Sequence, residues 1–313
     1  MVNITKKKIW VCGHNGMVGS AVVRRLKQED CKVLKIARQD LNLLNQSATE
    51  SWIQKNKPEI IILAAAKVGG IKYNMKHKAA FLYENLMIQN NVIHSASKQN
   101  VEKLIFLGSS CIYPKETPQP ILEEALMQGP LEETNEGYAL AKIAGLKLCK
   151  YLHEEFNKNF ISVMPSNIYG INDNFDPDNS HVLGALLRKI YLAKINGSKK
   201  IEVWGSGEPR REFLYVDDLA DAIIFLLKNY DSADPINIGT SKDISITELA
   251  LKISKIINHD IDINYNTSMP DGTFLKRLDT KKITQLGWKP KISLEDGISK
   301  TLDYCISNNI FKQ

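Results

Sequence analysis

The sequence predicts an α/β fold in which a parallel sheet is covered by helices on both faces. Two observations lead to this prediction. Strand-like and helix-like segments alternate through the first half of the chain, which is the pattern of repeated strand–helix–strand units. A turn rich in glycine, Gly13–Gly19, joins the first strand to the first helix, as expected near the start of such a sheet.

The elements of the first half follow from apolar runs and the breaks between them. The predicted strands are residues 8–12, 32–36, 59–65, 103–107 and 161–164, and the predicted helices are residues 17–27, 47–56, 79–98 and 138–157. Ser47 is the expected cap of the second helix, because Glu50 stands three positions later as in a capping box. Pro58 ends that helix.

The second half is less regular and predicts a second unit. Helices are expected at 182–195, 216–228 and 245–257, with a polar loop at 173–180 and a short strand at 201–204. We therefore predict a Rossmann-type doubly wound parallel sheet with a smaller, discontinuous α/β substrate domain. The expected division is 1–172 plus 209–241 for the first domain, and 173–208 plus 242–313 for the second. The second domain should close over the carboxyl edge of the sheet, where such sheets bind ligands.

Composition narrows the class of protein. The chain has 313 residues, of which 43% are hydrophobic and 24% charged, the balance of a globular protein. The longest apolar run, Ile60–Ala66, is too short to cross a bilayer, and we expect neither a signal peptide nor a membrane partner. The five scattered cysteines suit reduced thiols in a cytoplasm, and no metal-binding pattern is present. A net charge of +6 is too small to indicate nucleic acid binding.

The glycine turn predicts a dinucleotide site. Gly13, Gly16 and Gly19 have the spacing GxxGxxG, with Asn15, Met17 and Val18 between them. Glycines at a strand-to-helix junction let the backbone approach a pyrophosphate, and the free N–H groups of a helix N-terminus attract anions. A tight turn without a ligand is the less favoured alternative.

The choice between NAD and NADP depends on the end of the second strand. An NAD site usually carries an acidic residue there, but this region reads Lys35-Ile36-Ala37-Arg38, with no carboxylate before Asp40. Arg38 can pair with a 2′-phosphate, so the sequence favours NADP. The alternative is that Arg38 is a solvated surface arginine.

A tyrosine and a lysine predict the chemistry of a carbonyl reduction. Tyr138 and Lys142 are four residues apart and share a helical face, where an ammonium should lower the pKa of the phenol. Ser109 follows the strand 103–107, at the edge where a hydroxyl can bond the same substrate oxygen. One YxxxK is expected by chance in this composition. The order of glycine turn, serine and YxxxK nevertheless resembles the short-chain dehydrogenases/reductases.

Two further residues suit proton transfer beside a ketone. A carbonyl at C4 of a sugar acidifies the protons at C3 and C5. A thiolate at Cys111 can remove such a proton, and an imidazolium at His181 on the opposite face can return one. Each residue taken alone is more often structural.

Six runs resemble the GDP-L-fucose synthase family. They occur in the family's order and span nearly the whole chain: 64–70, 108–115, 138–145, 179–182, 204–207 and 270–273. In that family one site epimerises GDP-4-keto-6-deoxy-D-mannose at C3 and C5, then reduces C4 with NADPH. The resemblance therefore implies an enzyme with this activity, with NADP(H) as cofactor and a GDP-sugar as substrate.

The resemblance also implies individual roles. Cys111 is then the epimerisation base and His181 its acid, while Ser109, Tyr138 and Lys142 serve the hydride step. The residues implied at the cofactor are Gly13, Asn15, Gly16, Met17, Val18, Gly19, Arg38, Asp40, Leu43, Ala64, Ala65, Leu107, Gly108, Ser110, Lys142, Pro165, Asn167, Ile168 and His181. The residues implied at the substrate are Lys189, Trp204, Arg211 and Asp271, in which cations would meet phosphates, the indole would pack on a ring and the carboxylate would accept hydrogen bonds.

Departures from the family pattern leave alternatives open. Asn15 stands where the pattern has arginine, Gly137 stands where proline is expected, and Arg210 adds a cation beside Arg211. One alternative is a reductase of C4 alone, or an enzyme of a related GDP-sugar such as a heptose. Another is a non-catalytic NADP-binding sensor, which the presence of Tyr138 and Lys142 disfavours.

Assembly is predicted from the two long helices. Segments 79–98 and 138–152 carry apolar residues on more than one side, so we expect a homodimer formed through a four-helix bundle. Full burial of these residues within one chain is the alternative.

Overall fold

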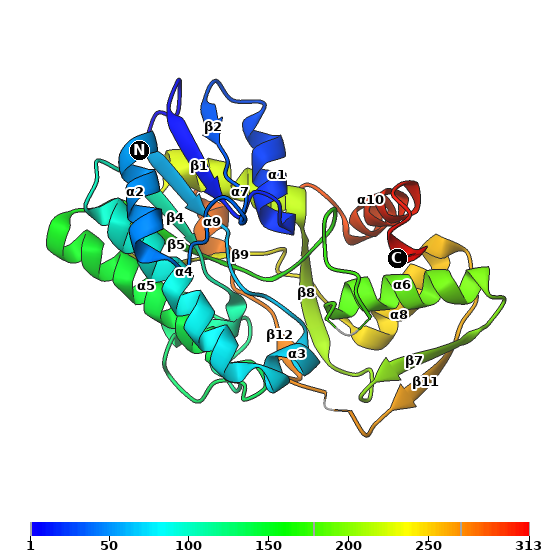
Figure 1. The fold of residues 1–313 in the computed structure, drawn as a ribbon. Coiled ribbons are helices and arrows are strands. Elements are labelled where there is room, and N and C mark those ends of the chain that lie inside the picture. The colour runs from blue at the N-terminus through cyan, green and yellow to red at the C-terminus, as the bar shows by residue number, and fades with distance from the viewer. Residues whose placement is uncertain (1, 178, 270, 313) are drawn as a thin grey trace.

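The computed structural model describes residues 2–177, 179–269 and 271–312. Pro270, part of one recognised run, lies outside them. The largest sheet has six parallel strands among the described residues, in the order β2-β1-β3-β4-β5-β9 (Figure 1). Their bounds are β1 Lys8–Cys12, β2 Lys32–Leu34, β3 Ile60–Leu63, β4 Lys103–Leu107, β5 Phe160–Pro165 and β9 Ile236–Ile238. The predicted α/β fold with a doubly wound parallel sheet is confirmed.

Helices cover both faces of this sheet. The flanking helices are α1 Met17–Leu26, α2 Gln46–Asn56, α4 Lys78–Ser97, α5 Glu136–Phe156 and α7 Val216–Asn229. Alternate residues of β1 show how the two layers form, because successive side chains of a strand point to opposite faces. Ile9 and Val11 join the core beneath α1 and α7, whereas Trp10 and Cys12 join the core beneath α2, α4 and α5. A strand buried on both sides therefore reads as one continuous apolar run.

Local caps set where two helices begin. Ser245 caps α8, Ile246–Ile257, in a capping box with Glu248, as its sequence suggests. The expected cap of α2 is wrong: Asn45, not Ser47, accepts the hydrogen bond from Ala48 N. The amide side chain of Asn45 precedes the helix and reaches its third residue, so α2 begins one residue earlier than predicted.

A second region lies beside the sheet, at the right of Figure 1. Its strands are β6 Asn167–Tyr169, β7 Lys200–Trp204, β8 Arg210–Tyr215, β10 Asp243–Ser245, β11 Asp262–Asn266 and β12 Leu275–Lys276. β8 pairs with β6, β10 and β12, while β7 pairs with β11. Helices α6 Val182–Ile195, α8 and α10 Leu294–Ser307 enclose a separate apolar core. The remaining elements are α3 Ile71–Lys76, α9 Lys281–Gln285, η1 Ser110–Ile112, η2 Glu123–Ala125 and η3 Ile310–Lys312.

One segment crosses the expected division between the regions. Helix α9 lies in the stretch assigned from sequence to the second domain, yet Ile283 and Trp288 are buried in the core of the large sheet. The Trp288 indole also donates a hydrogen bond to Asp221 of α7, at 3.2 Å. Burial of two large apolar side chains in this core favours the packing of α9 against the large sheet. The chain therefore returns to the first region before α10 leaves it again.

The strand order points to where ligands bind. The order reverses between β1 and β3, and ligands of open α/β sheets bind outside the carboxyl ends of strands at such a reversal. Gly13 follows β1 and Ala64 follows β3 at this edge, where Ala64 N donates to Cys12 O at 3.1 Å. The glycine turn is thus placed at the reversal.

Candidate active site

Two of the three glycines in the turn are required by the protein's own backbone. Gly13 has φ of +80°, and a Cβ on it would lie 2.8 Å from the backbone of Ala65. A Cβ on Gly19 would lie 2.1 Å from Gly13 O, so α1 packs directly on the turn. Gly16 is different, because it is exposed and caps α1 without a side-chain hydrogen bond. The first N–H groups of α1 are therefore left for an anion, as a dinucleotide pyrophosphate requires.

The neighbouring side chains fit the rest of a dinucleotide. Arg38 is exposed and, among the described residues, has no hydrogen-bond or ion-pair partner, so its guanidinium can meet a phosphate. Asn15 and Asp40 are also exposed, while Leu43 packs against the core. Two buried polar atoms, His14 Nδ1 and Ser166 Oγ, have no partner within the described structure. Unsatisfied groups beside the glycine turn and the end of β5 are what a bound ligand would satisfy.

The end of β5 lies at the carboxyl edge of the sheet, where the cofactor is expected to bind. Pro165 ends β5, and Asn167 and Ile168 begin β6. Asn167 Nδ2 donates to Glu212 O at 2.8 Å, which ties β6 to β8. Ile168 packs against the first core. These residues join the two regions at the carboxyl edge, next to Leu107 and Gly108 at the end of β4.

Ser109, Tyr138 and Lys142 form one group. Lys142 is only 3% exposed, donates to Leu107 O at 2.7 Å and lies with Nζ 5.7 Å from the centroid of the Tyr138 ring. Tyr138 shares a hydrogen bond with Ser109. The strand end, the following turn and one face of α5 thus bring the three side chains together.

The expected effect of Lys142 on the phenol is not what the structure shows. Burial is the largest influence on both groups: it raises the pKa of Tyr138 and lowers the pKa of Lys142 to about 7. Only the hydrogen bond from Ser109 favours the phenolate. The prediction from spacing was wrong in sign, because it considered the neighbouring charge and left out the cost of desolvating both groups.

Cys111 lies two residues beyond Ser109, in the short helix η1. The Ser109 hydroxyl accepts a hydrogen bond from Cys111 N at 3.2 Å, which holds the turn. The half-buried thiol has two polar neighbours, Asn135 Nδ2 at 3.4 Å and Lys276 Nζ at 3.7 Å. The sulfur therefore faces two donors, an arrangement that suits a thiolate better than an inert thiol.

His181 begins helix α6. The residue as a whole is exposed, but protein packed around the imidazole desolvates it and lowers its pKa. The preceding loop is fixed by Gly70, whose N–H donates to Asn179 O at 3.1 Å. A Cβ on Gly70 would lie 2.7 Å from Ser180 O, so the recognised runs around residues 70 and 180 pack directly on each other.

Lys189 and Trp204 lie together in the second region. The Lys189 ammonium is 5.6 Å from the centroid of the Trp204 ring and donates to Glu202 O at 3.1 Å. Trp204 is 40% exposed, and its Nε1 donates to Glu202 Oε1 at 3.0 Å. An exposed indole with a cation over its face is suited to pack on a flat ring that carries phosphates.

Arg211 and Asp271 meet at the loop before β12. Arg211 Nη2 donates to the backbone oxygen of Asp271 at 3.4 Å, and burial lowers the pKa of this arginine. Among the described residues Arg211 has no ion-pair partner, so its charge is available to an anion. The Asp271 carboxylate accepts from Ser206 N at 2.7 Å and from Ser206 Oγ at 3.0 Å. Asp271 therefore braces a protein turn as well as standing at the expected substrate position.

Two residues near the thiol were missed by sequence reasoning. Lys276 stands in β12 and Asn135 precedes α5, and neither has a local pattern that links it to Cys111. The one available signal was that Lys276 follows the recognised run 270–273 by three residues. Within the described parts of the chain, no cluster of three or more histidine, cysteine or acidic residues could hold a metal ion.

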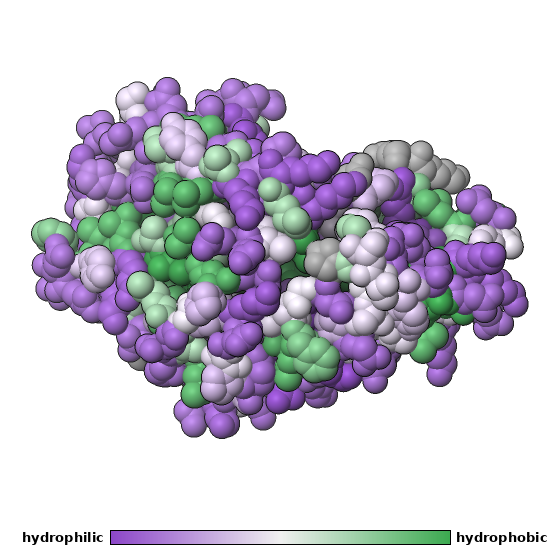
Figure 2. All heavy atoms as spheres, turned by 90° about the horizontal axis from the view of Figure 1, so that it is seen from below, coloured by the Kyte–Doolittle hydropathy of each residue, from purple (hydrophilic) through white to green (hydrophobic). Residues whose placement is uncertain are grey.

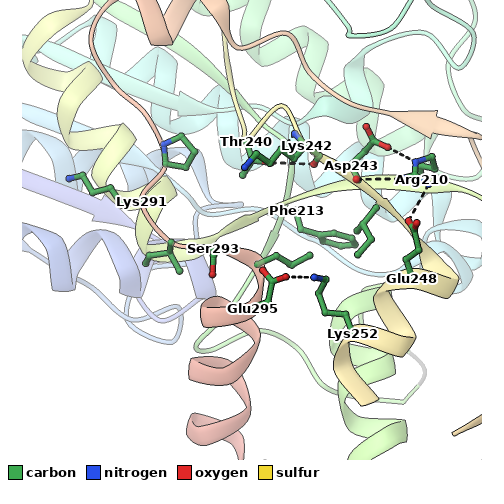
Figure 3. Close-up of a pocket in the computed structure, with 14 residues that line it drawn as sticks. Arg210, Phe213, Thr240, Lys242, Asp243, Glu248, Lys252, Lys291, Ser293 and Glu295 are labelled. Atoms are coloured by element: carbon green, nitrogen blue, oxygen red, sulfur yellow. Dashed lines mark hydrogen bonds and ion pairs between the residues drawn. The ribbon is translucent and has the colours of Figure 1, made fainter. Parts of the chain in front are cut away.

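A separate cavity lies away from these residues. It has a volume of about 780 Å³ and is lined by β8, β10, α8 and the segment before α10 (Figure 3). Five of its charged side chains pair within the cavity: Arg210 pairs with Asp243 and Glu248, and Lys252 pairs with Glu295. None of the candidate catalytic side chains lines it, so its size does not make it the catalytic site.

Comparison with known proteins decides the family. The model of the NAD dependent epimerase/dehydratase family matches residues 9–239. The chain belongs to this family. Its matched part contains the glycine turn, Ser109, Cys111, Tyr138 and Lys142. The match agrees with the Rossmann-type fold that the sequence predicts.

Within this epimerase/dehydratase family, individual relatives are similar over nearly the whole chain. A GDP-L-fucose synthase of Sinorhizobium fredii (strain NBRC 101917 / NGR234) is 51% identical over 302 residues, 96% of each chain. GDP-L-fucose synthase 1 of Arabidopsis thaliana is 49% identical over 302 residues, 96% of this chain and 94% of its own. The resemblance to the GDP-L-fucose synthases that the six runs indicated is confirmed.

Two solved structures are also similar to the chain. A GDP-6-OMe-4-keto-L-xylo-heptose reductase from C. jejuni superposes with a TM-score of 0.92 at 37% identity, covering 98% of this chain and 99% of that one. A GDP-L-fucose synthetase from Naegleria fowleri bound to NADP superposes with a TM-score of 0.90 at 30% identity, covering 99% and 97%. The fold of both regions is thus shared with enzymes named for GDP-sugars.

Proposed function

We propose that the protein converts GDP-4-keto-6-deoxy-D-mannose to GDP-L-fucose with NADPH, by epimerisation at C3 and C5 followed by reduction at C4. The observation that carries the proposal is the double engagement of Ser109, which hydrogen-bonds both Cys111 N and Tyr138. A base for carbon acids and a proton donor for a ketone are thereby anchored on one turn. A single bound sugar can meet both without leaving the site.

Epimerisation is the task of Cys111 and His181, here called the epimerisation group. The C4 carbonyl acidifies the protons on C3 and C5, and the thiolate removes one of them to leave an enolate. His181 returns a proton to the opposite face of the same carbon, which inverts it. Lys276 and Asn135 beside the sulfur support the charged form of the base.

Reduction is the task of Ser109, Tyr138 and Lys142, here called the reduction group. NADPH supplies the hydride to C4. Tyr138 gives a proton to the C4 oxygen, and Ser109 orients that oxygen through its hydroxyl. Lys142 lies beneath the ring, with its Nζ 5.7 Å from the ring centroid, and its hydrogen bond to Leu107 O fixes it there.

The proposed binding residues form two sets, one for the substrate and one for the cofactor. Arg211, without an ion-pair partner in the described structure, and Lys189 are the cations proposed for the substrate diphosphate, with Trp204 packing on a ring. Exposed Arg38 is proposed for the 2′-phosphate of NADPH, since Asn15 carries no charge. We propose the domain division 1–172 plus 209–241 and 173–208 plus 242–313, with α9 packing back on the first domain.

A reaction in heavy water tests the proposal. The enzyme is incubated with NADPH and GDP-4-keto-6-deoxy-D-mannose, and NADPH absorbance is followed together with deuterium at C3 and C5. We expect oxidation of NADPH with deuterium at both carbons. Oxidation without deuterium would leave a C4 reductase and remove the epimerisation roles. Neither oxidation nor exchange would contradict this substrate.

The second candidate is a C4 reductase or epimerase of a related GDP-sugar such as a heptose. The similarity to the heptose reductase from C. jejuni favours it. The same assay with a 4-keto-heptose derivative of GDP compares kcat/KM for the two sugars, and a preference for the heptose would reverse the ranking. A non-catalytic NADP-binding sensor, the third candidate, is contradicted by any turnover.

We also propose a homodimer formed by α4 and α5. Figure 2 looks toward the side of α4 and α5, where hydrophobic side chains gather. Tyr83 of α4 is 62% exposed, and Leu140 and Tyr151 of α5 are exposed in one row at helical spacing. Burial of this row by a second copy would form a four-helix bundle. Light scattering should give a dimer mass, and a monomer at micromolar concentration would contradict it.

A cytoplasmic location is proposed from the thiols. All five cysteines are free, and Cys111 must stay reduced to act as a base. No helix of the described residues is long and apolar enough to cross a membrane. Fractionation of the native cells should recover the protein with cytoplasmic markers.

A further inference from the structure

We propose that Lys276 is a positioning residue for epimerisation, because its ammonium pairs with the Cys111 thiolate and maintains that base. The pairing itself needs no substrate, whereas its consequence for epimerisation rests on the proposed function. Lys276 comes from a strand that lies 165 residues from Cys111 in the sequence. The contact is therefore a property of the folded protein.

The geometry leaves the thiol as the partner of this lysine. Lys276 Nζ lies 3.7 Å from Cys111 Sγ, and Lys276 has no carboxylate partner among the residues described. Its neighbour Arg277 is paired with Asp243 at 3.0 Å, and Arg210 across the strand pair is held by the same carboxylate at 2.5 Å. Two of the cations near Lys276, Arg277 and Arg210, are thus neutralised by Asp243, while Lys276 itself contacts the sulfur.

The backbone on both sides of Lys276 is fixed. Strand β12 pairs with β8 in the register Leu275↔Arg210 and Lys276↔Arg211. The Gln119 amide clamps the strand, because its Nε2 donates to Leu275 O at 2.9 Å and its Oε1 accepts from Arg277 N at 3.0 Å. Next along the chain, Leu278 N donates to a buried carboxylate, Glu212 Oε2, at 2.7 Å. A side chain on such a support loses little freedom on pairing.

The charges that face the sulfur are few. Arg211 of β8 and Tyr138 of α5 interact electrostatically with Cys111, and Asn135 donates to it. Two carboxylates in this neighbourhood act on Arg211: Glu132, which lies 3.5 Å from Lys115, and Asp271. Among the described residues, Lys276 is therefore the cation that contacts the sulfur directly. Removal of its charge should therefore have the largest effect on the reactivity of the sulfur.

The chemistry explains why such a partner is useful. A thiol removes a proton from carbon only after it has lost its own, so the rate follows the thiolate population. When the thiolate takes the proton from C3 or C5 it becomes a neutral thiol, and the ammonium stays protonated throughout. Because the site is half-buried, the pair is screened less by salt than a surface pair.

Alkylation of the free enzyme tests the pairing. The rate at which iodoacetamide modifies Cys111 at pH 7 is followed by mass spectrometry in the native protein and in Lys276→Gln. We expect the substitution to slow modification by about fivefold or more. Lys276→Arg keeps the charge and should restore most of the rate. Cys31, whose pKa is raised by burial and nearby acids, is a slow internal reference thiol.

Controls separate this role from others. Lys281→Gln changes a lysine that is 82% exposed in its side chain, and should leave Cys111 modification unchanged. An unchanged rate in Lys276→Gln with a native circular dichroism melt would overturn the proposal. A raised KM for the sugar nucleotide with unchanged modification would likewise overturn it, and would assign Lys276 to substrate anions. The alkylation assay contains no sugar nucleotide. Its outcome is therefore independent of whether the proposed substrate is correct.

In the full reaction the same variants should split the two steps. Lys276→Gln should slow deuterium entry at C3 and C5 by the same factor as alkylation, while NADPH binding stays within about twofold of native. Equal slowing of exchange and of cofactor binding would indicate general disruption of the site and would contradict the positioning role.

Discussion

The reduction group and the epimerisation group are built from different parts of the molecule. Ser109, Tyr138 and Lys142 come from one strand end and one helix of the large sheet, and Lys142 is almost fully buried. Cys111 shares that turn, but its partners come from β12 and from the start of α5, and His181 comes from the loop before α6. The first group has a single rigid support, whereas the second is completed only where both regions meet.

This difference indicates which reaction step depends on contacts between the two regions. A hydride step needs fixed geometry and low dielectric, which buried elements of one sheet provide. Proton transfers at two carbons need groups on opposite faces of a sugar, and these have to come from opposite walls. Substitutions in one group should therefore alter one step and leave the other. The first two of four predictions test this division, and the four run from the largest expected effect to the smallest.

The largest effect is expected for Cys111→Ala. Loss of the base should reduce deuterium entry at C3 and C5 by about 1000-fold, within the range of general base catalysis. Binding of NADPH should be unchanged, since the reduction group is intact. Nuclear magnetic resonance of the recovered sugar measures the exchange. Exchange at a native rate would show that another residue is the base.

A smaller effect is expected for Tyr138→Phe. The substitution removes the proton donor and keeps the ring, so NADPH oxidation should fall by about 100- to 1000-fold. Deuterium exchange should stay within a few-fold of native, because the Ser109 bond to Cys111 N remains. The absorbance of NADPH follows the first rate. A fall of equal size in both rates would contradict the division into two groups.

Burial of the reduction group predicts a pH-dependent stability change for Lys142→Met. The pKa of Lys142 is lowered from 10.5 to about 7, so the lysine is costly to the fold below pH 7 and this cost disappears as the pH rises toward 10.5. The free energy of unfolding of the variant should exceed that of the native protein by about 3 kcal/mol at pH 6, a figure that already subtracts the lost hydrogen bond to Leu107 O. At pH 10 the gain should be much smaller. Urea unfolding at both pH values measures this. A gain that does not shrink with pH would contradict the assignment.

The smallest effect is expected for Arg38→Ala. Removal of one exposed guanidinium should weaken NADPH binding by about tenfold and leave NADH binding nearly unchanged, since only NADPH carries the 2′-phosphate. Lys32→Ala, also exposed on β2, is the matched control and should alter neither. Fluorescence titration of both cofactors measures the ratio. Equal weakening of the two would place Arg38 elsewhere than at the 2′-phosphate.

Sequence reasoning was strongest where contacts are local. The apolar runs predicted five of the six strands of the sheet to within a few residues, because a buried parallel strand is marked by its own side chains. Strand β9 was not predicted. Tyr138 and Lys142 share a face of α5 since four residues make about one turn. The helix predicted at 245–257 is found with Ser245 as its cap, whereas the cap predicted at Ser47 is wrong because Asn45 is better placed.

Reasoning from spacing failed where burial or distant segments decide. The pKa of Tyr138 is raised although a lysine lies four residues away, since desolvation of a ring depends on what packs around it. Ile283 and Trp288 return to the first core, and Asp271 braces Ser206, because of neighbours 45 or more residues away. No local pattern reports such neighbours.

The sequence by itself determined the parallel sheet, the glycine turn at its edge and the residue types for hydride and proton transfer. These depend on periodicity and on spacings within about one strand–helix unit, which the order of residues contains. The tertiary structure alone decided that Lys276 faces Cys111, that the adjacent Arg277 is neutralised by Asp243, and that Tyr138 and Lys142 are desolvated. The reason is physical: charge interactions and desolvation act through space, and only the packing of β8, β12 and η1 sets those distances.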